Sequence, residues 1–105
     1  MELKKQIGEK IKQIRKNKGF TQEQLAEMIE IEVPNLSNLE RGKFAPSIDT
    51  LQKLSKALNA HTWEFYYFND ISNETMSKEI NDIFDKKPKL IKIIYNFLKI
   101  IENNI

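Results

Sequence analysis

A chain of 105 residues, 40% of them apolar and 30% charged, has the size and composition of one soluble globular domain with a small appended element. The absence of cysteine excludes disulfides, thiolate nucleophiles and cysteine-ligated metals. Seventeen Lys and Arg against fifteen Asp and Glu give a net charge of +2, so a basic surface must come from the arrangement of the charges.

The N-terminal part of the chain predicts two helices in succession. Apolar residues at helical spacing indicate a first helix over residues 3–18, which Gly19 ends. Thr21 and Gln24 have the spacing of a capping box and indicate the start of a second helix. We expect Met28 on the buried face of this second helix.

Three further short helices are predicted before residue 69. The third covers about residues 33–41, and a glycine follows it. Ser47 is placed to cap the fourth, on which we expect Ile48 to face the core, and Asn59 can take the left-handed conformation that closes it. The fifth covers about residues 62–68.

The C-terminal part of the sequence has a different pattern. Apolar residues form one stripe over residues 76–84, a break follows at residues 85–88, and residues 90–101 are apolar on more than one face. Since no strand-like alternation is present, the sequence predicts an all-α fold. Residues 1–68 would form a five-helix domain and residues 69–105 a helical hairpin.

Several motifs together carry a resemblance to a known family. They are Arg15, the run GFTQEQLA, the run LERGK, Pro46-Ser47 and the pattern L-x-K-L-x-K-A-L, all within about residues 5–66. The sequence resembles the lambda-repressor-like, or Xre-type, helix-turn-helix domain of bacterial and phage regulators. The resemblance implies a five-helix fold in which the second and third helices form the helix-turn-helix unit and the third lies in the major groove of DNA.

The resemblance also implies roles for individual side chains. Arg15 of the first helix would form an ion pair with Glu40 and tie the first helix to the third. Gln22, at the start of the second helix, would face a DNA phosphate. Arg41 and Lys43 would bind phosphates at the far end of the third helix.

The outward face of the third helix would read the bases. By position in the family pattern, the base-reading residues would be Val33, Pro34, Ser37 and Asn38, with Asn35 at the edge. Two leucines of this helix must face the core, which turns residues 34, 35, 37, 38 and 41 to the opposite side. Asn38 can bond an adenine, and Val33 and Pro34 can pack on thymine methyl groups, which favours A/T base pairs.

Two glutamates depart from the family pattern. Glu32 would lie near the DNA, at the position where the family has a Ser or Thr as helix cap. Its carboxylate could accept a hydrogen bond from the N4 amine of a cytosine, or it could repel a phosphate. The family prefers glycine where Glu30 stands, and a positive φ there would cost a glutamate roughly 1–2 kcal/mol.

Aromatic and aliphatic residues exceed what a small domain needs in two places. The run HTWEFYYF holds five aromatic residues, and the last predicted helix is apolar around more than half its girth. These residues could cover the C-terminal hairpin, form a dimer interface, or do both. The candidates for a dimer contact are Trp63, Tyr67, Phe68, Ile93, Phe97 and Ile100.

The sequence therefore predicts a dimeric, sequence-specific DNA-binding repressor that reads A/T-rich inverted repeats in the cytoplasm of a bacterium. One alternative is an antitoxin with the same fold, whose tail neutralises a toxin protein. The other is a protein-interaction module without DNA binding. With a single histidine, His61, and no nucleophile set, paired carboxylates or phosphate loop, the sequence predicts neither an enzyme nor a cofactor or metal site.

Overall fold

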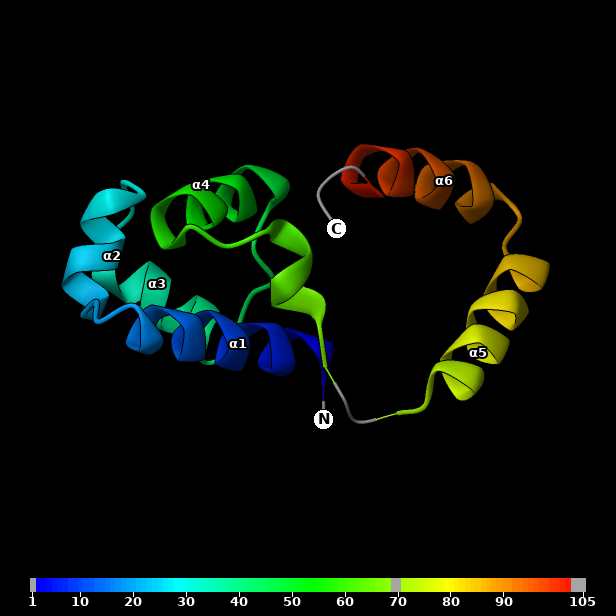
Figure 1. Ribbon diagram of the computed structural model, residues 1–105, viewed down its shortest axis with the longest axis horizontal. Coiled ribbons are helices and arrows are strands. Elements are labelled where there is room, and N and C mark those ends of the chain that lie inside the picture. The colour runs from blue at the N-terminus through cyan, green and yellow to red at the C-terminus, as the bar shows by residue number, and fades with distance from the viewer. Residues whose placement is uncertain (1, 69–70, 103–105) are drawn as a thin grey trace. The chain divides into compact units, whose positions relative to one another are not determined.

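The computed structural model describes residues 2–68 and 71–102, with the side chains of residues 100 and 101 excepted, so the predicted contact of Ile100 lies outside the described part. The chain forms two compact units, Met1–Tyr66 and Tyr67–Ile105 (Figure 1). All regular elements in the described residues are helices, which confirms the predicted all-α class. They are α1 (Leu3–Asn17), α2 (Gln22–Met28), α3 (Val33–Glu40), α4 (Ile48–Leu58), the 3₁₀ helix η1 (Thr62–Tyr66), α5 (Asn73–Lys86) and α6 (Lys89–Ile101).

Local hydrogen bonds set the ends of the helices in the first unit. The backbone N–H of Gln24 donates to Thr21 Oγ1 at 3.0 Å, and the Thr21 N–H donates to Gln24 Oε1 at 2.9 Å, which completes the predicted capping box. The Thr50 N–H donates to the Oγ of Ser47 at 3.1 Å and caps α4. Asn59 closes α4 in the left-handed conformation, with φ of 49°.

The core of the first unit lies between α1 and α4. In Figure 1 these helices lie on opposite sides of the unit, and α2 and η1 stand between them, one at each end. Each helix contributes apolar side chains at helical spacing, so all of them share one core. The fully buried side chains include Ile11, Leu25, Ile29, Leu36, Leu54, Leu58 and Phe65.

Two predicted core positions and one predicted helix are wrong in detail. Met28 is 48% exposed, because it is the last residue of α2, and Ile48 is 70% exposed, because it is the first residue of α4 and precedes the turn that reaches the core. The fifth helix is a 3₁₀ helix that ends at Tyr66 rather than residue 68. Partial burial there raises the pKa of the Tyr66 phenol above its ordinary value.

A glycine allows α1 to pack closely against α3. Gly8 is buried on α1, and a Cβ at this position would clash with the carbonyl oxygens of Leu39 and Glu40. Only glycine permits this approach, since the atoms in the way are backbone atoms that cannot move aside. The end of α3 is therefore fixed against α1.

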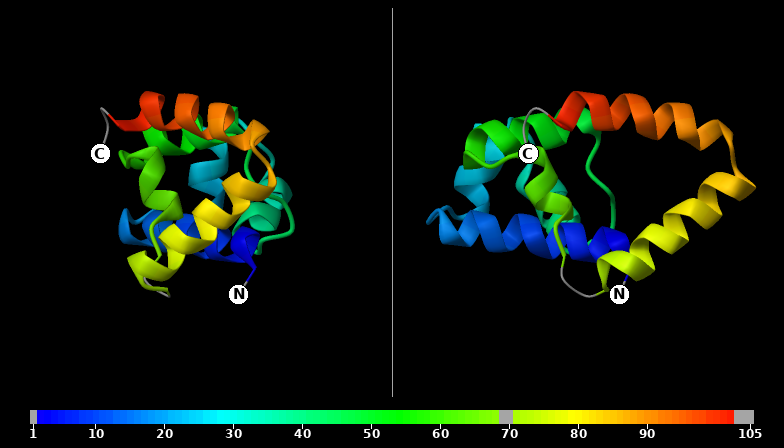
Figure 2. Two further views of the ribbon diagram at one scale, coloured as in Figure 1. Left: turned by 90° about the vertical axis from the view of Figure 1, so that its right-hand side faces the viewer. Right: turned by 45° about the vertical axis from the view of Figure 1, so that its right-hand side comes forward.

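The second unit consists of α5 and α6, joined by a short turn at Lys87 and Pro88. The Oγ of Ser72 caps α5 by accepting from the Thr75 N–H at 3.2 Å. From the turn the two helices spread apart, as Figure 2 shows from two sides. None of the described side chains of α5 and α6 is buried, so this unit has no core of its own comparable to that of the first. Within the described residues, no helix has the length and apolar character that a membrane crossing requires.

Candidate nucleic-acid interface

Helix α3 has one face in the core and one face turned outward. Leu36 and Leu39 are buried, with exposed fractions of 0% and 8%, and hold the helix in the unit. The predicted reading residues lie on the other face, where Pro34 and Asn35 are exposed and Val33, Ser37 and Asn38 are half-buried. On an α-helix Pro34, Ser37 and Asn38 form the centre of this face, and Val33 and Asn35 flank it on opposite sides.

The start of α3 depends on unusual residues. Glu32 is the N-cap residue, but its side chain makes no capping hydrogen bond. Pro34 lies in the first turn, where its missing N–H would have no intrahelical partner. Glu30, in the turn between α2 and α3, has φ of 60°, so this glutamate takes the conformation for which the family pattern prefers glycine.

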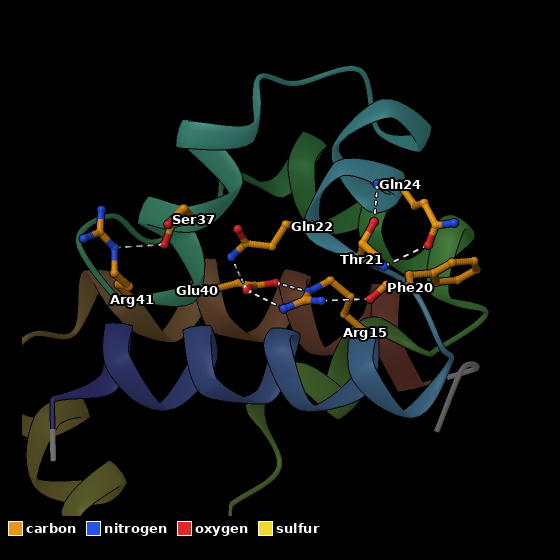
Figure 3. Close-up of polar contacts among 8 residues, drawn as sticks. All are labelled: Arg15, Phe20, Thr21, Gln22, Gln24, Ser37, Glu40 and Arg41. Carbon is orange, nitrogen blue, oxygen red and sulfur yellow. Dashed lines mark hydrogen bonds and ion pairs between the residues drawn. The ribbon is translucent and has the colours of Figure 1, made fainter.

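A buried polar network holds α3 against α1 and α2. The guanidinium of Arg15 forks onto Glu40, with Nε donating to Oε2 at 2.6 Å and Nη2 donating to Oε1 at 3.1 Å. Its Nη1 donates to the carbonyl oxygen of Phe20 at 2.8 Å, in the turn that leads to α2. Gln22 Nε2 donates to Glu40 Oε1 at 2.9 Å. These side chains converge between the three helices in Figure 3.

This network neutralises one carboxylate and fixes α3 against α1 and α2. Arg15 and Glu40 have exposed fractions of only 6% and 4%, so their charges interact with little screening by water. Gln22, predicted to face a phosphate, uses one amide hydrogen on Glu40 and keeps a second N–H and its carbonyl oxygen for other contacts. The sequence motif suggested no link between this glutamine and Glu40.

The C-terminal end of α3 carries the two cationic side chains predicted to bind DNA phosphates, Arg41 and Lys43. Gly42 takes φ of 77°, and the Lys43 N–H donates to the Asn38 carbonyl oxygen at 3.0 Å, so the chain leaves the helix in a Schellman turn that keeps Lys43 near its end. Arg41 is exposed, and its Nη2 donates to Asn38 Oδ1 at 2.7 Å, while its Nε lies 3.4 Å from the Ser37 carbonyl oxygen. In Figure 3 Arg41 points away from the buried network and toward Ser37.

The contact between Arg41 and Asn38 was not predicted, although the sequence holds a signal for it. The two residues are three positions apart, which places side chains next to each other on a helix. An arginine and an asparagine at this spacing can pair, since the amide oxygen is an acceptor and the guanidinium carries only donors. The family resemblance alone assigns Arg41 to the DNA backbone and says nothing of this pair.

The residues predicted for a dimer contact fall in both units. Trp63 is half-buried in η1 and stacks on His61, with ring centroids 6.1 Å apart. In the second unit Tyr67 is exposed and Phe68 half-buried, and the outward positions of α6 include Ile93, 61% exposed, and Phe97, 42% exposed. In the described parts of the chain, no group of three His, Asp or Glu is placed to hold a metal ion.

Comparison with known proteins agrees with this arrangement. A profile of the helix-turn-helix family matches residues 11–62. The transcriptional regulator ImmR of Bacillus subtilis is 39% identical over 80 residues, which are 72% of this chain and 63% of that protein. The competence pilus inhibition repressor of Acinetobacter baylyi is 32% identical over 89 residues, which are 85% of this chain and 77% of that protein.

Solved structures show the same fold. In the structure of the SinR and SinI protein complex, one chain aligns with a TM-score of 0.57 and 27% identity, over 92% of this chain and 98% of that chain. This protein belongs to the lambda-repressor-like, or Xre-type, helix-turn-helix family. The family consists of DNA-binding transcriptional regulators and not of enzymes. The chain spans less than two thirds of the length of ImmR.

Proposed function

We propose that this protein is a sequence-specific DNA-binding repressor that acts in the bacterial cytoplasm and reads DNA through the outward face of α3. The observation that carries the proposal is the carboxylate-free outward face of this helix, with Pro34, Ser37 and Asn38 at its centre and Val33 and Asn35 at its edges. A helix presented in this way fits the major groove of B-DNA. Family membership supports the same conclusion.

Contacts to the DNA backbone would place the helix in the groove. Lys43 lies at the end of α3, and Gln22 lies at the start of α2 with a spare amide N–H. Phosphate contacts of this kind fix the register of a protein on DNA, whereas base contacts give specificity. Val33 and Pro34 would pack against thymine methyl groups and favour A/T pairs.

A gel-shift assay with genomic fragments at several salt concentrations tests this function. We expect a few fragments to bind tightly, with an affinity that falls as salt rises. Lys43→Ala should weaken binding to all fragments. It should also lower, by about one, the magnitude of the slope of the logarithm of the binding constant against the logarithm of the salt concentration. Lys56→Ala is the matched control, since this exposed lysine lies on α4 and not beside α3, and it should change neither. Failure of the wild-type protein to prefer any fragment would reject the proposal.

We further propose that the protein is a homodimer held by its second unit. The described part of this unit has no buried side chain and exposes Ile80, Ile83, Ile91, Ile93, Phe97 and Leu98. Helix α5 has four acidic and two basic residues, whereas α6 has three lysines and no acid. The α5 of one copy therefore suits the α6 of another, and two such helix pairs can form a four-helix bundle.

Dimerisation would also serve DNA reading. A two-fold protein places its two reading helices about one helical turn apart, roughly 34 Å, and so reads an inverted repeat. Sedimentation equilibrium tests the interface: Phe97→Asp should shift the protein from dimer to monomer, because a charge would enter an apolar contact. Asn96→Asp adds the same charge on the neighbouring polar position and should leave the dimer intact. A fragment of residues 1–70 that remains dimeric would refute the proposal.

A second candidate role for the tail is binding to a different protein. The likeness to a chain from the SinR and SinI complex extends over both units, and that complex is an assembly of two different proteins. An antitoxin would use its tail in the same way, to hold a toxin. A pulldown with the full chain that recovers the product of a neighbouring gene, together with a monomeric chain in isolation, would favour this role over the homodimer.

A further inference from the structure

The pairing of Arg41 with Asn38 changes what the reading face offers to DNA. Asparagine carries one acceptor oxygen and two N–H donors, and arginine carries donors only. The Asn38 oxygen already accepts from Arg41 Nη2 at 2.7 Å. This oxygen keeps one further lone pair, whereas every other group that the pair can offer to DNA is an N–H donor of the amide or of the guanidinium.

The base that matches such a surface differs from the base that a free asparagine selects. In the major groove adenine presents the N7 acceptor and the N6 donor, so a free asparagine bonds it with both ends of its amide. Guanine presents two acceptors, N7 and O6. Asn38 Oδ1 can still accept a second hydrogen bond, but the guanidinium beside it is a cation that disfavours the adenine N6 donor and favours the two guanine acceptors.

We propose that Arg41 and Asn38 act as one reading unit, in which Arg41 orients the Asn38 amide and the pair selects guanine. This inference rests on the proposed DNA-binding function and replaces the adenine partner expected for Asn38 from sequence alone. Arg41 lies at the C-cap of α3, and its guanidinium folds back along the helix toward Ser37 and Asn38. The guanidinium therefore lies beside the reading residues, where it can take part in base selection as well as attract phosphate.

Selection of bound sites from random DNA by the full-length protein tests the reading unit. We expect a guanine at one position of each half-site, identified as the position whose preference disappears in Asn38→Ala. Arg41→Met keeps the apolar stem but removes every N–H, so it frees the Asn38 oxygen. At the same position the preference should shift from guanine to adenine, and affinity for the original site should fall roughly tenfold to a hundredfold.

A matched control separates base selection from attraction to phosphate. Lys43→Ala removes a cation at the same end of α3 but leaves the pair of Arg41 and Asn38 intact. It should weaken binding to every sequence alike and leave the base preference unchanged. If Arg41→Met behaves like Lys43→Ala, Arg41 contacts phosphate only and the reading unit is rejected. If the wild-type protein already prefers adenine at this position, the inference is rejected as well.

A double-mutant cycle on the selected site gives a second readout. Two side chains that act as one unit lose affinity only once, so the combination of Arg41→Met and Asn38→Ala should bind about as weakly as the weaker single variant. If the fold-loss of affinity in the double variant equals the product of the fold-losses in the two single variants, the inference is overturned. Both positions are at least partly exposed, and circular dichroism of the variants checks that they fold. A wild-type protein that selects no sequence at all would reject the proposed function itself, and the inference with it.

Discussion

Replacement of Arg15 by methionine is the most direct test of how α3 is held in place. The change removes a guanidinium that donates at 2.6 Å and 3.1 Å to Glu40 and at 2.8 Å to the carbonyl oxygen of Phe20. Glu40, only 4% exposed, would keep a single hydrogen bond, from Gln22. Methionine retains the apolar stem, so the change tests the charge and its hydrogen bonds rather than packing.

The expected loss is large compared with the stability of the unit. Removal of one partner from a buried ion pair costs about 3–5 kcal/mol, because the remaining charge is buried without compensation. A unit of this size has a total free energy of unfolding of about 3–10 kcal/mol. Since each kcal/mol shifts the melting temperature of a small domain by about 4–8 °C, we expect the Tm of Arg15→Met to fall by at least about 12 °C.

Urea and thermal unfolding followed by circular dichroism measure this loss. Arg41→Met is the control, because this exposed arginine should change stability by no more than about 0.5 kcal/mol. The pair of changes Arg15→Met and Glu40→Leu removes both charges and should recover most of the loss. A loss below about 1 kcal/mol for Arg15→Met would show that the network adds little to the attachment of α3.

Three further substitutions test the local structure of the first unit by urea unfolding. Glu30→Gly should stabilise it by about 0.5–1 kcal/mol, because relief of a left-handed glutamate exceeds the entropic cost of a glycine; a loss would show that φ of 60° is not strained here. Ser47→Ala should cost about 1 kcal/mol through the lost cap of α4, whereas the control Ser77→Ala, in the middle of α5 in the second unit, should leave unfolding of the first unit unchanged. Leu54→Ala, at a fully buried position, should cost about 2–5 kcal/mol, whereas Ile48→Ala, 70% exposed, should cost little; equal losses would contradict the burial pattern.

The helices of the first unit could be predicted from sequence because local signals mark their ends. Thr21 and Gln24 cap each other across three residues, and Ser47 caps α4 in the same local way. Burial at helix ends could not be predicted, since Met28 and Ile48 have apolar side chains but lie where the helix has turned away from the core. Apolar periodicity gives the direction of a face and not the residue at which contact with other elements stops.

The candidate site was only partly predictable, because its parts come from elements distant in sequence. The residues on the outward face of α3 follow from helical periodicity. The hydrogen bond from Gln22 to Glu40 joins residues 18 positions apart, and periodicity within one helix carries no information about it. The same holds for Gly8, whose lack of a side chain matters only because the backbone of α3 approaches α1 at that residue.

Residues 19–43, which hold α2 and α3, include five glutamates, and the arrangement of their charges is compatible with the proposed DNA-reading role. Glu40 is buried against an arginine. Glu23 lies in the first turn of α2, where the helix dipole stabilises a carboxylate. Glu27 and Glu30 belong to α2 and the turn after it, and Glu32 precedes α3. The outward face of α3 itself carries no carboxylate and one guanidinium. Because the nearby glutamates still repel phosphate, we expect weak non-specific binding and a shallow salt dependence, so base contacts must supply a large share of the affinity for a specific site.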